Sequence, residues 1–94
     1  MLRLLIASPY PALRAGLRVL LDAATTVVGE AEAVDACLEA ARTARPDVIL
    51  FDLALEGEAF PDGVWQLRQQ SPASAVLALS DSNSDPRVLA ALQA

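Results

Sequence analysis

Short apolar runs alternate with segments of helical periodicity along the whole chain. Each run is bounded by proline, glycine or polar residues, which favours a β-strand. Between the runs, apolar residues recur three and four positions apart, which is typical of amphipathic helices. The pattern predicts strands at residues 2–7, 26–30, 47–53 and 75–79, and helices around residues 13–21, 34–41, 64–70 and 86–94. This alternation indicates a parallel α/β sheet with right-handed crossovers and helices on both faces.

The third predicted strand is apolar on both faces and ends in a carboxylate. The run Val48-Ile49-Leu50-Phe51 contains no polar position, which indicates a strand covered by helices on both sides of the sheet. Asp52 follows at the carboxyl end of this strand, where open α/β sheets place their functional groups. The second predicted strand is more polar, so we expect it at an edge of the sheet.

Length and composition predict one globular domain that covers residues 1–94. The chain is 54% hydrophobic with a net charge of −5, a poor match for direct nucleic-acid binding. It contains no histidine and no lysine, so Ser-His, Cys-His, Schiff-base and P-loop chemistry are excluded and no catalytic residue is expected. The single cysteine, Cys37, fits a buried thiol in a cytoplasmic protein. No apolar run reaches the roughly 18 residues of a membrane span.

In their order and spacing, these motifs resemble the receiver domain of two-component response regulators, most closely the receivers that precede a helix-turn-helix DNA-binding domain. The similarity is carried by the first strand and helix, the Asp52 strand, the Asp-Gly pair at 62–63 and the run from Ala75 to Ser80. It covers essentially the whole chain. It implies a flavodoxin-like, doubly wound parallel sheet of order 2-1-3-4, without the fifth strand and helix of the family. The first helix should cover one face, and the second and third helices the other.

The resemblance assigns Asp52 to the phosphoacceptor position and Ser80 to the switch hydroxyl after the fourth strand. In the family, two acidic residues after the first strand join the acceptor in holding Mg²⁺, and a lysine on the fifth strand pairs with the phosphate. Here Ser8 and Pro9 occupy the acidic positions, and the chain has no lysine. Neutral side chains do not offset the charge of a phosphoryl donor beside a carboxylate. We therefore expect no Mg²⁺, other metal or cofactor at Asp52.

The chain is accordingly expected to be a degenerate receiver domain, the regulatory module of a cytoplasmic bacterial signalling or transcription protein. It would act through contacts with itself, with a C-terminal output domain or with a signalling partner such as a histidine kinase. Two alternatives stay open. Asp52 could accept a phosphoryl group by an unusual arrangement, or a small ligand could use the cavity that the missing acidic pair leaves.

Other side chains near the predicted site have simpler interpretations. Glu56, Glu58 and Asp62 are expected to be solvated loop carboxylates. Tyr10, between two prolines, is expected to fill the space that a metal ion would take. Trp65 is expected to anchor its short helix as a half-buried side chain.

The fourth predicted strand suggests self-association. Without a fifth strand beside it, residues 75–79 would form an apolar edge with unpaired backbone groups that recruit other strands. The last predicted helix would expose apolar residues as well. We therefore expect a two-fold dimer whose candidate interface residues are Val76, Leu77, Leu79, Val88, Leu89 and Leu92.

Overall fold

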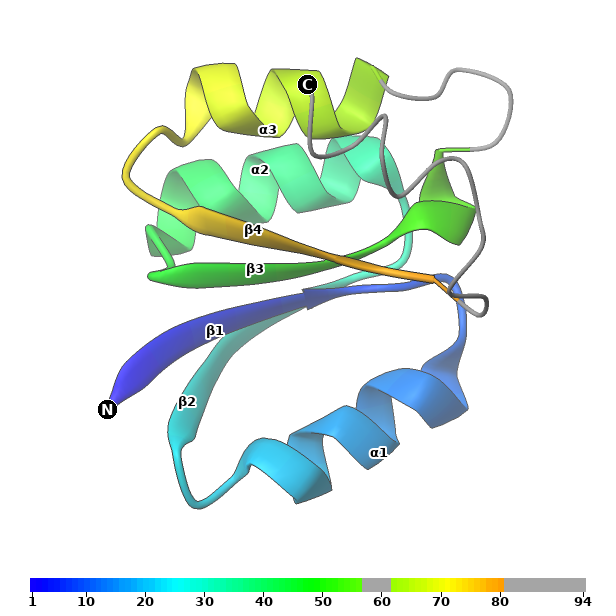
Figure 1. Ribbon diagram of the computed structural model, residues 1–94, viewed down its shortest axis with the longest axis vertical. Coiled ribbons are helices and arrows are strands. Elements are labelled where there is room, and N and C mark those ends of the chain that lie inside the picture. The colour runs from blue at the N-terminus through cyan, green and yellow to red at the C-terminus, as the bar shows by residue number, and fades with distance from the viewer. Residues whose placement is uncertain (57–61, 81–94) are drawn as a thin grey trace.

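A four-stranded sheet with helices on both faces forms the protein (Figure 1). The structure, a computed structural model, describes residues 1–56 and 62–80. The strands are β1 (Leu2–Ala7), β2 (Thr25–Ala31), β3 (Val48–Asp52) and β4 (Ala75–Leu79). The helices are α1 (Pro11–Leu21), α2 (Val34–Ala44), the short 3₁₀ helix η1 (Leu53–Leu55) and α3 (Asp62–Gln70). The helix expected at residues 86–94 lies outside the described residues.

The sheet has the order β2-β1-β3-β4, and all three strand pairs are parallel, as the alternating pattern predicted. The central pair of strands runs from Leu4 opposite Val48 to Ala7 opposite Phe51. This register places the carboxyl ends of β1 and β3 next to each other, so the residues that follow these two strands meet at one edge of the sheet.

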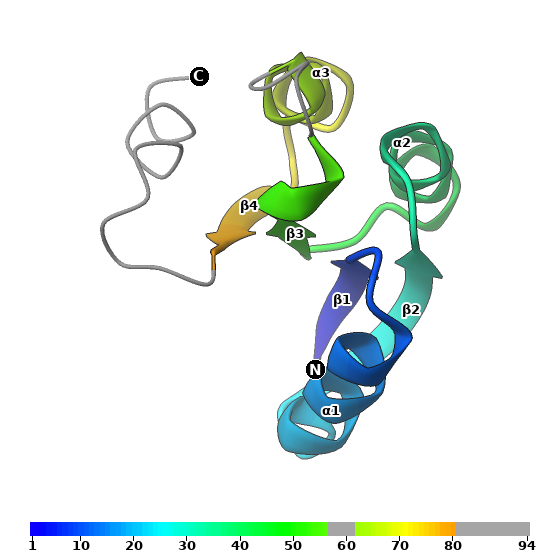
Figure 2. The same cartoon turned by 90° about the vertical axis from the view of Figure 1, so that its right-hand side faces the viewer.

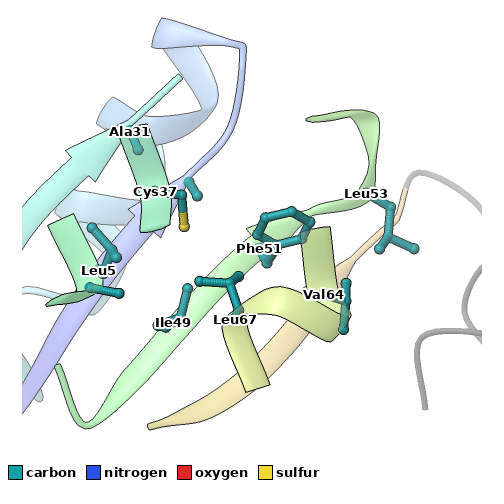
Figure 3. Close-up of a cluster of buried hydrophobic side chains, with 10 residues drawn as sticks. Leu5, Ala31, Cys37, Ile49, Phe51, Leu53, Val64 and Leu67 are labelled. Carbon is teal, nitrogen blue, oxygen red and sulfur yellow. The ribbon is translucent and has the colours of Figure 1, made fainter. Parts of the chain in front are cut away.

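Helix α1 covers one face of the sheet, and α2 and α3 cover the other (Figures 1 and 2). The larger buried cluster lies between the sheet and α2 and α3 (Figure 3), and it includes Leu5, Cys37, Ile49, Phe51, Val64 and Leu67. The smaller cluster contains Leu4, Ile6 and Leu50, against which Leu17 and Leu21 of α1 pack. Because β1 and β3 contribute to both clusters, the side chains of these two strands are buried on both faces.

Helix ends follow the local sequence. Pro11 opens α1, where its missing N–H costs no hydrogen bond. Helix α2 ends at Ala44, and its C-cap residue Arg45 adopts the left-handed conformation with φ of 49° directly before Pro46. Among the described residues, no helix is long and apolar enough to cross a membrane.

The rotation of the helices determines how far two of their apolar side chains are exposed. Trp65 was expected to be a half-buried anchor of its helix, and 53% of it is exposed, so about half of the residue is covered. Helix α3 buries Val64 and Leu67, and Trp65 lies about 100° around the helix from Val64. Leu20 belongs to the apolar pattern of α1 but is 79% exposed, because the helix directs Leu17 and Leu21 to the sheet instead.

Candidate functional site

Asp52 is the carboxylate at the centre of the site. It is the last residue of β3, and only 7% of it is exposed. Its Oδ1 accepts a hydrogen bond of 2.9 Å from the backbone N–H of Ala54, which caps the first turn of η1. Part of its role is therefore local, because the carboxylate satisfies a backbone donor where β3 turns into the short helix.

Ser8 supplies the second partner of Asp52. The residue follows β1 and is completely buried, and its hydroxyl donates a hydrogen bond of 2.8 Å to Oδ2 of Asp52. The same hydroxyl oxygen accepts a bond of 3.2 Å from the backbone N–H of Tyr10. The resemblance to receiver domains assigned Ser8 to one of the two acidic positions of that family. The structure brings this residue into direct contact with Asp52.

The backbone of Ser8 is fixed as well. Its N–H donates to the carbonyl of Ala31 at 2.9 Å, which extends the pairing of β1 with β2. Its carbonyl accepts a bond of 2.7 Å from the guanidinium of Arg14 on α1. Arg14 also pairs with Glu30 at 3.2 Å. Strand, helix and side chain together hold the Ser8 hydroxyl toward Asp52 with little freedom to move.

The two residues that follow Ser8 do not fill the space beside Asp52, where Tyr10 was expected to take the place of a metal ion. Pro9 is half-buried and carries neither a charge nor a backbone N–H. Tyr10 was expected to fill the space of a metal ion, but 55% of it is exposed. Its backbone N–H, rather than its ring, bonds to the group beside Asp52. The position next to the carboxylate is taken by the Ser8 hydroxyl.

The oxygen donors around Asp52 are few. Within residues 1–56 and 62–80, no group of three histidine, cysteine, aspartate or glutamate side chains lies close enough to hold a metal ion. One carboxylate and one neutral hydroxyl stand where Mg²⁺ would need several oxygen ligands in octahedral geometry. The hydroxyl is already engaged with the carboxylate, so the residues present do not fit a magnesium site.

An open cavity of about 410 Å³ lies over the carboxylate. Ser80, which follows β4 and is half-buried, lines this cavity together with Asp52 and Ala54. Tyr10, Leu13, Leu17 and Leu79 form the rest of its wall. The predicted switch hydroxyl and the predicted acceptor therefore share one cavity, whose wall is mainly apolar.

Glu56 has a role that the sequence did not indicate. It was expected to be a solvated loop carboxylate, but it is only 5% exposed. Its two carboxylate oxygens accept hydrogen bonds from the backbone N–H groups of Gly63 and Val64, at 2.7 and 3.1 Å. A negative charge at a helix N-terminus is favoured by the helix dipole. Glu56 thus caps α3, while Asp62 is exposed and Glu58 lies outside the described residues.

The residues proposed for an interface differ in exposure. Leu77 is 54% exposed, whereas Val76 and Leu79 are half-buried. Val76 packs on the α2 and α3 side and Leu79 on the α1 side. Among the described strands, β4 has a neighbour on one side only. The other candidates, Val88, Leu89 and Leu92, lie outside the described residues.

Comparisons with known proteins agree with this architecture. A family model described as the response regulator receiver domain matches residues 4–94. The chain is 34% identical over 92 residues to the nitrate/nitrite response regulator protein NarL of Escherichia coli K12, covering 96% of this chain and 43% of that protein. The chain therefore spans less than half the length of this curated relative.

Solved structures show the same fold. The signal receiver domain of the putative response regulator NarL from Mycobacterium tuberculosis superposes with a TM-score of 0.85 at 29% identity, covering 98% of this chain and 76% of that one. The isolated REC domain of RcsB from Salmonella enterica serovar Typhimurium, solved in the presence of the phosphomimetic BeF3-, has a TM-score of 0.79 at 25% identity. That match covers 98% of this chain and 70% of the other.

Proposed function

We propose that this chain, which belongs to the response regulator receiver domain family, is a degenerate receiver that regulates its partners through protein contacts rather than through a phosphorylated Asp52. The hydrogen bond of 2.8 Å from the Ser8 hydroxyl to Asp52 carries this proposal. In the family, the position of Ser8 holds an acid that shares a magnesium ion with the acceptor. Here a neutral group takes that position and uses the acceptor as its own hydrogen-bond partner.

The electrostatics of the site support the proposal. Phosphoryl transfer depends almost entirely on positioning and on cations that neutralise the charge developing on the phosphoryl group. Among the described residues, the three ion pairs are Arg14–Glu30, Arg18–Glu30 and Arg42–Glu39, and none involves Asp52. Within residues 1–56 and 62–80, neither a magnesium site nor an ion pair compensates the Asp52 carboxylate that an anionic phosphodonor would meet.

The contacts through which such a domain would work are with other proteins. Receiver domains of this family are regulatory modules, and we propose that this one controls a C-terminal output domain or a signalling partner, such as a histidine kinase, in a cytoplasmic transcription regulator. Its net charge of −5 does not favour direct binding to nucleic acid. The similarity to the curated regulator NarL supports this assignment.

Self-association is part of the proposal. In the described structure β4 forms an edge of the sheet, and Leu77 projects from it with half of its surface exposed. The strand carries neither a charge nor a proline, which are the devices that usually protect an edge. Pairing of β4 between two copies would satisfy its outer backbone groups and bury Leu77.

One observation favours the alternative of a working phosphoacceptor. Asp52 lines an open cavity, so a small donor can reach it. The isolated REC domain of RcsB from Salmonella, which was solved in the presence of the phosphomimetic BeF3-, has the same fold. Incubation with acetyl phosphate and Mg²⁺, followed by intact-mass measurement, separates the two functions. A degenerate receiver keeps its mass, and a working receiver gains one phosphoryl group that Asp52→Asn abolishes.

A further inference from the structure

The cavity over Asp52 combines an apolar wall with one acidic group. Leu13 and Leu17 of α1 and Leu79 at the end of β4 form much of the wall, and Tyr10 lines it as well. The volume of about 410 Å³ lies within the range of small-molecule sites, which is roughly 300–1,000 Å³. Such sites typically pair apolar walls with a few polar groups that orient the ligand.

The acidic group in this cavity accepts its hydrogen bonds from neutral donors. Asp52 is 7% exposed and accepts hydrogen bonds from the Ser8 hydroxyl and the Ala54 N–H, both of which are neutral. A carboxylate offers about four lone-pair sites, so acceptor capacity remains on Asp52, which also lines the cavity. No ion pair within residues 1–56 and 62–80 compensates this charge. A nearly buried carboxylate of this kind is stabilised by any cation that the cavity admits.

The shape and chemistry of the wall select among cations. A metal ion would need several oxygen ligands, and leucine side chains offer none. An organic ammonium group can donate to the free side of Asp52 while its hydrocarbon body lies against Leu13, Leu17 and Leu79. Tyr10, which also lines the cavity, is aromatic, and aromatic rings attract cations and apolar groups alike. Anionic ligands are disfavoured by the carboxylate itself.

From this combination we propose that the cavity over Asp52 binds a small organic amine, an ammonium group attached to an apolar body, with Asp52 as the charge partner. This function goes beyond the protein contacts proposed above, and it needs neither magnesium nor a phosphodonor. A bound amine would bridge α1 and the ends of β3 and β4, three elements on which the arrangement of the site depends.

Phenethylamine and 2-phenylethanol are a matched pair of probes, since they share an aromatic body and differ mainly in the charged group. Both should be titrated into the 94-residue chain at millimolar concentrations while the NMR signals of the protein methyl groups are followed. We expect phenethylamine to bind at least about tenfold more tightly than the alcohol, as charged hydrogen bonds contribute more than neutral ones. The methyl signals of Leu13, Leu17 and Leu79 should shift, whereas those of Val34 and Leu67 on the other face should not.

Two variants that each remove one negative charge test whether Asp52 is the charge partner of the amine. In Asp52→Asn the preference for the amine should disappear, while the affinity for 2-phenylethanol stays within about twofold. Asp35→Asn, on an exposed position of α2, removes the same charge far from the cavity and should leave the preference intact. Equal affinity for both probes in the wild-type chain would overturn the proposal. So would an amine preference that survives Asp52→Asn, shifts confined to the α2 face, or no binding of either probe.

Discussion

The hydroxyl of Ser8 lies 2.8 Å from Oδ2 of Asp52 and joins the end of β1 to the end of β3. Both residues are almost entirely shielded from water. In this arrangement Asp52 serves as a structural acceptor that holds two neighbouring strand ends and the first turn of η1 together. The site therefore has a stabilising role that does not depend on phosphorylation.

Removal of the Ser8 hydroxyl should destabilise the fold. Ser8→Ala leaves a buried carboxylate oxygen without its donor, so we expect the free energy of unfolding to fall by about 1–3 kcal/mol. Urea denaturation followed by circular dichroism measures the change. Thr43→Ala, at an exposed position of α2, is the control and should change stability by less than about 0.5 kcal/mol.

The double variant Ser8→Ala/Asp52→Asn tells whether the two residues act as a pair. Its loss of stability should be smaller than the sum of the two single losses, because residues in direct contact are coupled. Strictly additive losses would show that the hydrogen bond does not contribute to the stability of the site.

The two helical glycines should respond in opposite directions to alanine. At Gly63 an added methyl group would overlap the carboxylate of Glu56, which caps α3, and would press on Val34. We expect Gly63→Ala to lower the unfolding free energy by about 1–3 kcal/mol. At Gly16 no atom beyond the two chain neighbours and the backbone of the same helix lies within 4 Å of the added group, so Gly16→Ala should raise the unfolding free energy by about 0.5–1 kcal/mol. Thermal melts of both variants check this pair, and a stable Gly63→Ala variant would contradict the cap.

The architecture was accessible from the sequence because each element carries its own local signal. The apolar run from Val48 to Phe51 identifies a buried parallel strand, and the Arg45-Pro46 pair marks the end of a helix. The positions of Asp52 and Ser80 at strand ends follow from the same pattern. The contact of Ser8 with Asp52 requires the order of the strands as well, because 44 positions separate the two residues.

What the sequence missed depends on three-dimensional contacts. Glu56 lies seven positions before Gly63, and nothing in the local pattern shows that its carboxylate folds back onto the start of α3. Leu20 belongs to the apolar pattern of α1, but it is 79% exposed because the helix directs Leu17 and Leu21 to the sheet instead. Hydrophobicity alone does not specify which apolar side chains of a short helix reach the sheet.

Stability should fall in alkaline solution because of Cys37. Burial raises the pKa of this thiol from its ordinary value of 9.0 to about 12. In the unfolded chain the thiol ionises as the pH passes 9, while in the folded chain it stays neutral to about pH 12. The stabilisation is therefore complete below pH 9 and is lost between about pH 9 and pH 12.

Between pH 7 and pH 10, the wild-type chain should lose about 1.4 kcal/mol more unfolding free energy than Cys37→Ala does. Urea titrations of both proteins at the two pH values measure this difference. Equal losses in the two proteins would mean that the thiol is not protected by burial.

If two copies associate through β4, a charge introduced on this strand should dissociate the dimer. At micromolar concentration the chain should sediment as a dimer, and Leu77→Lys should convert it to a monomer, because a lysine on this edge opposes strand pairing. Leu20→Lys introduces the same change at an exposed position of α1 and should leave the dimer intact. A wild-type chain that sediments as a monomer would exclude this interface.

The central claim is that Asp52 does not work as a magnesium-dependent phosphoacceptor, and phosphorylation measured by intact mass tests it most directly. The wild-type chain is incubated with acetyl phosphate and millimolar Mg²⁺, and Asp52→Asn and an incubation with EDTA serve as controls. We predict that the wild-type mass stays unchanged, as in both controls, because Ser8 and Pro9 supply no charge to hold the metal. A mass increase of one phosphoryl group in most of the wild-type protein, dependent on Mg²⁺ and absent in Asp52→Asn, would contradict the account.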